Sequence, residues 1–154
     1  MTDDFLGVEA AMFDRTELGL EQALRGLQAG MAEAAADAAG GWPAVIAIVD
    51  HQGDLVAYAR QDRCLEMSKS VALRKAYTAA LGQSDTGEYT ERVLKGTGRT
   101  MEQHLGPRAR SGAGGFVIKR PGDGLCLGGV GVSGASTVER DEAIGRACIQ
   151  AMGV

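Results

Sequence analysis

The sequence predicts an α+β fold in which an antiparallel sheet is flanked by helices. Two β-hairpins are expected, at residues 44–60 and 115–132, and a hairpin joins antiparallel strands without a crossover. Helical segments precede, separate and follow these hairpins. With 154 residues, the chain has the length of one domain with a sizeable core. We divide it into an N-terminal arm, residues 1–13, and a single domain, residues 14–154.

The first half of the domain is predicted to run helix, hairpin, helix. The first helix is expected from Asp14 to the Gly40-Gly41 pair. Residues 44–50 and 55–60 are apolar and are expected to pair as strands around a glycine-containing turn. The helix at residues 66–81 has an alanine-rich face, which predicts close packing on the sheet. The buried face of the first helix is expected to carry Leu20, Leu24, Leu27 and Met31.

The second half begins with a long irregular segment, residues 84–114. Glycine and threonine interrupt it repeatedly, so that only two short helices are expected, around residues 89–94 and 100–105. Residues 115–119 and 125–132 then form the second hairpin. A last helix is expected from Thr137 to about Met152.

The junction between the last strand and the last helix is rich in glycine. Gly128, Gly129 and Gly131 remove side chains from a buried strand, which suits a site where either another backbone or a flat ligand approaches closely. Ser136 and Glu139 have the spacing of a capping box, which predicts the helix start. We assign Glu139 and the following Asp141 to capping and to the helix dipole.

Composition excludes several function classes. The net charge is −4 and the basic residues are scattered, which argues against nucleic-acid binding. The acidic start does not resemble a signal peptide, and no run of eighteen apolar residues exists, so a membrane partner is not expected. Cys64, Cys126 and Cys148 are odd in number and widely spaced, which predicts reduced thiols in a cytoplasmic protein.

Four motifs from Leu18 onward together resemble the GlcG/HbpS-like family of small heme-associated domains, which includes PduO C-terminal-type domains. The motifs are Val49-Asp50-x-x-Gly53-x-Leu55-Val56, Arg60-x-Asp62, Ala72-x-x-Lys75-Ala76-Tyr77-Thr78-Ala79, and Gly131-Val132-Ser133-Gly134-Ala135-Ser136 with Asp141-Glu142 behind it. The resemblance implies a profilin-like fold, a homo-oligomer, and a pocket that takes heme or a related tetrapyrrole in some members. It therefore implies heme as a possible cofactor here.

The chain departs from the family pattern in two places. Gly114-Gly115-Phe116-Val117-Ile118 lacks the proline that is usual before the penultimate strand. Arg63-Cys64 replaces the usual Gly-Ala pair after the first hairpin. We expect both changes on pocket walls, where they would alter the ligand and leave the fold unchanged.

We therefore expect a cytoplasmic, oligomeric protein that binds a small ligand, with heme or a related tetrapyrrole as the first candidate. Heme needs an axial ligand and a cation for its propionates. His104, in a glycine-flanked segment, is the expected axial ligand in preference to His51 in the hairpin turn. The expected ligand-binding residues are Arg60, Lys75, Thr78, Gly114, Gly115, Phe116 and Ser133.

Two other functions remain open. The first is an enzyme of the same fold that performs acid/base chemistry on a small carboxylate or polar metabolite. Its catalytic set would be Asp62, Glu66, Lys75 and His104, provided that these groups converge. A structural alternative for Lys75 is a surface position or an ion pair with Asp62. The second is an assembly role in which the N-terminal arm docks on another protein.

Overall fold

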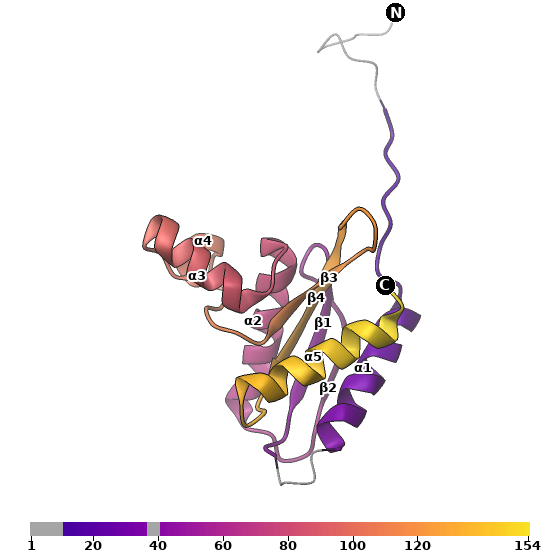
Figure 1. Cartoon of the computed structure of the whole chain (residues 1–154), viewed down its shortest axis with the longest axis vertical. Coiled ribbons are helices and arrows are strands. Elements are labelled where there is room, and N and C mark those ends of the chain that lie inside the picture. Colours follow the sequence, from indigo (N-terminus) through magenta and orange to yellow (C-terminus); the bar gives the residue numbers. More distant parts are fainter. Residues whose placement is uncertain (1–10, 37–40) are drawn as a thin grey trace, which may run out of the picture.

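One antiparallel sheet organises the molecule (Figure 1), which is a computed structural model that describes residues 11–36 and 41–154. Its strand order is β2-β1-β4-β3. The strands are β1 (Val45–Asp50), β2 (Leu55–Arg60), β3 (Gly115–Lys119) and β4 (Cys126–Ser133). The two hairpins pair with each other through β1 and β4, again antiparallel. The prediction of two hairpins in one antiparallel sheet is confirmed.

Helices cover both faces of this sheet. α2 lies on one face, and α1 and α5 lie side by side on the other (Figure 1). α3 and α4 form a separate projection next to α2 (Figure 1). Among the described residues, no helix has the length and apolar character needed to cross a membrane. The bounds are α1 (Leu20–Ala35), α2 (Glu66–Gly82), α3 (Thr86–Thr97), α4 (Met101–Leu105) and α5 (Val138–Met152).

The central strand β1 is buried on both sides, because successive side chains point to opposite faces. Ile46 and Ile48 join the core under α1 and α5. Val45, Ala47 and Val49 join a smaller core under α2, whose contribution is three alanines, Ala72, Ala76 and Ala80. The alanine-rich face predicted for the second helix is therefore the face that contacts the sheet.

The glycines of β4 allow α2 to lie directly on the sheet. A Cβ atom at Gly129 would collide with the carbonyl oxygen of Ala76, and one at Gly131 with that of Ala72. The sequence left two explanations for these glycines open, the approach of another backbone or of a flat ligand. The structure shows the first, because the backbone of α2 lies against Gly129 and Gly131.

The first helix starts later than predicted, at Leu20 instead of Asp14. Residues 11–19 carry no regular structure, and their last part is tied to the second hairpin. Arg15 Nη2 donates to the Cys126 carbonyl at 2.7 Å, and Arg120 Nη1 donates to Thr16 Oγ1 at 2.6 Å. These bonds hold the segment extended and displace the helix start.

The buried face of α1 also differs from the prediction. Leu20 and Leu24 are exposed, whereas Ala23, Gly26, Leu27 and Gly30 are buried. The reason is the closeness of α5, since side chains of Cys148 and Met152 occupy the space where Cβ atoms of Gly26 and Gly30 would stand. Leu27 was placed correctly, and Met31 packs against the core while remaining partly exposed.

The predicted N-terminal arm lies mostly outside the described residues. Within its described part, Met12 and Phe13 are exposed and do not cover the domain.

The last helix begins one residue later than predicted, at Val138 instead of Thr137. The cap of α5 is Thr137, whose Oγ1 accepts from the Arg140 N–H at 3.1 Å. The predicted capping box of Ser136 and Glu139 is therefore wrong: the helix is capped one residue later, by Thr137 alone.

Arg63 occupies a backbone conformation that suits glycine. Its φ is 65°, in the left-handed region, and it is one of two non-glycine residues with positive φ among those described. The resemblance described above implies a glycine at this position. Left-handed backbone costs a residue with a Cβ atom about 1–2 kcal/mol.

We expect Arg63→Gly to stabilise the fold by up to about 1 kcal/mol, because relief of strain exceeds the added freedom of glycine in the unfolded chain. Urea unfolding followed by circular dichroism measures the change. Arg99→Gly is the matched control, since Arg99 is exposed and its φ is not positive. A destabilised Arg63→Gly variant would contradict the assignment of strain.

Candidate functional site

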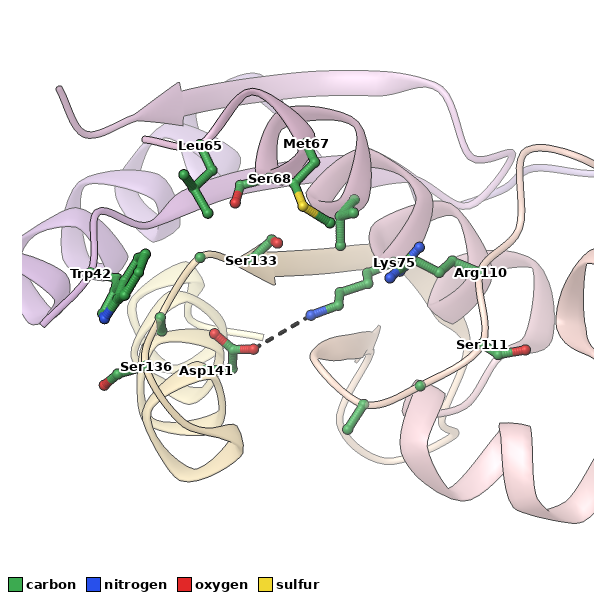
Figure 2. A pocket seen from close by; sticks show the side chains of 15 residues that line it. Trp42, Leu65, Met67, Ser68, Lys75, Arg110, Ser111, Ser133, Ser136 and Asp141 are labelled. Carbon is green, nitrogen blue, oxygen red and sulfur yellow. Dashed lines mark hydrogen bonds and ion pairs between the residues drawn. The ribbon is translucent and has the colours of Figure 1, made fainter. Parts of the chain in front are cut away.

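A pocket of about 560 Å³ opens at one end of α2, next to the junction between β4 and α5 (Figure 2). We call it the Lys75 pocket. Its walls come from α2, residues 110–113, residues 133–136 and the first turn of α5. This volume lies in the range of small-molecule sites. The lining residues are Trp42, Leu65, Met67, Ser68, Val71, Lys75, Arg110, Ser111, Gly112, Ala113, Ser133, Gly134, Ala135, Ser136 and Asp141.

One wall of the Lys75 pocket is apolar. It consists of Trp42 and Leu65, which precede β1 and α2, and of Met67 and Val71 from α2. Trp42, Leu65 and Met67 are 59%, 50% and 63% exposed. Large apolar side chains gathered at the mouth of a concavity are typical of a surface that a ligand or a partner covers.

The pocket also holds a buried ion pair, drawn as a dashed line in Figure 2, which lies between Trp42 on one side and Arg110 on the other. Lys75 Nζ donates to the Val132 carbonyl at 2.9 Å and lies 3.4 Å from Asp141 Oδ2. Lys75 and Asp141 are each 8% exposed. α2 and α5, which pack on opposite faces of the sheet, thus meet through this pair at the end of β4.

Burial opposes the charged form of both partners. It lowers the pKa of Lys75, an effect that Asp141 counters and that nearby Arg110 reinforces. It raises the pKa of Asp141, while Lys75 and the Ala135 N–H oppose the rise. Two pKa values that move toward each other are typical of groups that exchange protons, although structural ion pairs can show the same shifts.

Arg110 adds a second cation to the pocket, near enough to Lys75 to lower its pKa. The Arg110 N–H donates to Thr78 Oγ1 at 2.8 Å, which fixes the backbone of the loop. Its guanidinium has no hydrogen bond or ion pair to any residue in the described part of the chain. Lys75 and Arg110 against Asp141 leave one positive charge in excess, which favours an anionic ligand group.

Several predicted binding residues support the pocket from behind its surface. Thr78 is fully buried and braces the loop through its hydroxyl, which also donates to the Arg74 carbonyl at 2.7 Å. Gly114 has a φ of 109°, and a Cβ atom there would collide with Lys75 Nζ. Gly115 donates its N–H to Thr86 Oγ1 at 2.9 Å. Of the predicted binding set, Lys75 and Ser133 line the pocket directly.

Other predicted binding residues lie elsewhere. Phe116 points to the opposite face of the sheet, where it fills the space above Gly145 of α5. Arg60 lines a different concavity, together with Asp62. Neither Arg63 nor Cys64 is among the residues that line the Lys75 pocket. The expectation that both departures from the family pattern fall on its walls is therefore wrong for Phe116, Arg63 and Cys64.

The predicted acid/base set does not converge. Glu66 is exposed at the start of α2 and pairs with Lys69. His104 is exposed on α4, with its ring 6.1 Å from that of Tyr89, and does not line the pocket. Asp62 follows the edge strand β2, so Lys75 pairs with Asp141 and not with Asp62. Of the four, Lys75 alone belongs to the pocket.

Trp42, Met67 and Arg110 were not expected at the site, and Asp141 was expected to serve the helix dipole. The burial of Asp141 could have been predicted from the sequence. It lies three residues before Ile144 and seven before Cys148, so it continues the apolar stripe of α5 into the core. A carboxylate on a buried stripe requires a partner, and Lys75 supplies it. The described residues contain no cluster of three or more metal-ligating side chains.

Comparison with known proteins gives a consistent result. The family model "Haem degrading protein HbpS-like" matches residues 18–150. The corrinoid adenosyltransferase PduO of Citrobacter freundii is 36% identical over 113 residues, which are 73% of this chain and 33% of PduO. Protein GlcG of Escherichia coli (strain K12) is 38% identical over 92 residues, 60% of this chain and 65% of GlcG. The chain thus spans about one third of PduO.

Solved structures share the fold. A PduOC:heme complex superposes with a TM-score of 0.74 at 29% identity, covering 88% of this chain and 95% of PduOC. HbpS superposes with a TM-score of 0.75 at 29% identity, and the match covers 93% of this chain and 97% of HbpS. The ORFY protein of Klebsiella pneumoniae superposes with a TM-score of 0.79 at 23% identity, and the match covers 96% of this chain and 99% of ORFY. At this identity the likeness shows a shared fold.

We expect Asp141→Ala to destabilise the protein by about 3 kcal/mol, because it leaves the buried Lys75 without its partner. The double variant Lys75→Met, Asp141→Leu should recover most of this loss, since it removes both charges. Urea unfolding measures both. Glu21→Ala breaks the exposed pair with Arg25 and should change little. Equal effects of Asp141→Ala and Glu21→Ala would refute a buried, coupled pair.

Proposed function

Because this chain belongs to the haem-degrading HbpS-like family, we propose that it binds haem or a related tetrapyrrole in the Lys75 pocket. One observation carries the proposal: the pocket combines an apolar wall that includes Trp42 with the cations of Lys75 and Arg110, and Trp42 and Arg110 lie on opposite sides of it (Figure 2). Haem has the same division, with a flat apolar macrocycle and anionic propionates. The PduOC:heme complex, 29% identical to this chain, supports the choice of ligand.

The residues present fit such a ligand. Trp42 would pack on the macrocycle, and Arg110, whose guanidinium has no partner among the described residues, would bind a propionate. Met67 is the one lining residue whose side chain belongs to the usual haem-ligating types, so it replaces His104 as the proposed iron ligand. When bound, haem would supply redox-active iron.

We also propose a cytoplasmic homo-oligomer. The exposed apolar side chains at the pocket mouth, Trp42, Leu65 and Met67, support a surface that a neighbouring subunit covers. The three cysteines are free, as is usual in a reducing compartment. The ligand-binding role does not depend on either statement.

A second candidate function is acid/base catalysis on a small carboxylate. It is favoured by the Lys75 and Asp141 pair, which is buried within a pocket and has both pKa values shifted toward each other. Arg110 would hold the carboxylate of the substrate. Here the catalytic residues would be Lys75 and Asp141, in place of the set expected from the sequence.

Titration with hemin, followed in the Soret region, tests the proposal. We expect saturable binding of one hemin per chain. Arg110→Gln should weaken binding about tenfold, since a charge-assisted hydrogen bond contributes roughly 1.5–3 kcal/mol. Met67→Leu keeps the apolar volume but removes the thioether, and should shift the Soret maximum.

His104→Ala and His51→Ala are the controls, because neither residue lines the pocket. Both should bind hemin as the unchanged protein does. Loss of binding in either histidine variant would place the ligand outside the Lys75 pocket. A linear, non-saturating response of the unchanged protein would overturn haem binding and leave the acid/base candidate.

A further inference from the structure

The surroundings of Lys75 Nζ are those of a nucleophilic amine. We propose that Lys75 is a carbonyl-reactive residue that forms an imine with an aldehyde bound in the Lys75 pocket. This reactivity requires the pocket but not haem, so it stands or falls independently of the function proposed above.

The hydrogen bonds of Nζ are the first argument. An ammonium group has three N–H donors, whereas a neutral amine has two N–H donors and one lone pair. The protein supplies two acceptors to Nζ, the Val132 carbonyl oxygen at 2.9 Å and Asp141 Oδ2 at 3.4 Å. The protein therefore partners two of the tetrahedral positions of Nζ and leaves the third without a protein acceptor, and this third position can carry the lone pair once the proton passes to Asp141.

The place of Lys75 in the pocket is the second argument. Lys75 lines the pocket, and Figure 2 shows its side chain reaching from α2 toward Asp141. Gly114 packs against the amine on one side, where any Cβ atom would collide with Nζ. Because Lys75 lines the pocket, a small aldehyde would approach the amine from the pocket side. Burial also lowers the pKa of Lys75, which increases the neutral fraction.

Asp141 supplies the acid that imine formation needs. The neutral lysine nitrogen attacks the carbonyl carbon, an N–C bond forms, and one proton of the nitrogen passes to the carbonyl oxygen to give a carbinolamine. Asp141, in its protonated form, then donates its proton to the hydroxyl. The C–O bond breaks, water leaves, and Asp141 regains a proton from the iminium nitrogen. The net change is amine plus aldehyde to imine plus water, with no oxidant or reductant.

The rest of the pocket defines the class of aldehyde. Trp42, Leu65 and Met67 form an apolar wall suited to an aromatic or other apolar body. Arg110 places an unpartnered cation at the same end as Lys75 and suits a carboxylate. We therefore expect an apolar aldehyde with an anionic group to react faster than an uncharged one.

The test is reductive trapping with 4-carboxybenzaldehyde and sodium cyanoborohydride at neutral pH, followed by peptide mapping. Lys69, Lys95 and Lys119 are the internal controls, because they are the other lysines of the chain. We expect Lys75 to be labelled at least about tenfold faster than any of them. The uncharged 4-methylbenzaldehyde should label Lys75 more slowly. Preferential labelling of the other lysines, or equal labelling of all four, would overturn the proposal.

Two variants separate the roles. Asp141→Asn keeps the shape of the side chain but cannot act as an acid, and should slow trapping at Lys75 by about 100-fold, the lower range for general acid catalysis. Lys119→Arg removes a surface lysine and should leave trapping at Lys75 unchanged. Circular dichroism checks that each variant is folded. Should Asp141→Asn not fold, labelling of the unchanged protein alone decides the proposal. Unslowed trapping in a folded Asp141→Asn variant would remove Asp141 from the mechanism.

Discussion

The contact between α2 and β4 is the constraint on which the site depends. Gly129 and Gly131 have no side chain on the face that α2 covers, so the carbonyl groups of Ala72 and Ala76 lie against the strand backbone. Lys75 immediately precedes Ala76. Because the helix packs this closely, Lys75 Nζ can donate a hydrogen bond to the Val132 carbonyl. Larger side chains on β4 would lift α2 and separate Lys75 from both of its partners.

The same geometry explains why a charged pair is buried. Lys75 comes from the helix on one face of the sheet and Asp141 from a helix on the other, and they meet at the end of β4 (Figure 2). Burying two charges is costly, and apolar residues of similar volume often stabilise a core as well or better. The pair also lies beside Arg110 and an apolar wall, in a pocket open to solvent. Its position therefore fits binding and proton transfer better than it fits stability alone.

Much of the fold follows from local patterns in the sequence. Both hairpins and the alanine face of α2 were predicted, because short apolar runs bounded by glycine-containing turns are local signals. The buried face of α1 was predicted incorrectly. The leucine spacing indicated Leu20 and Leu24, whereas Gly26 and Gly30 are the residues that pack against α5. That contact joins segments far apart in the chain, and no local pattern reports it.

The site was predictable only in part. Lys75 and Ser133, which were expected together among the ligand-binding residues, line the same pocket. Arg110 and Trp42 lie in irregular segments, whose path depends on tertiary contacts such as the bond from the Arg110 N–H to Thr78. His104 was expected at the site because of its residue type and its glycine-flanked segment, but that segment forms the short helix α4 and leaves His104 exposed.

The most direct measurement is a crystal structure of the protein grown with hemin. The account expects the macrocycle against Trp42 and Met67, with a propionate on Arg110 and the Lys75 and Asp141 pair at its polar end. Haem bound at His104 or His51, with the Lys75 pocket free of it, would contradict the account.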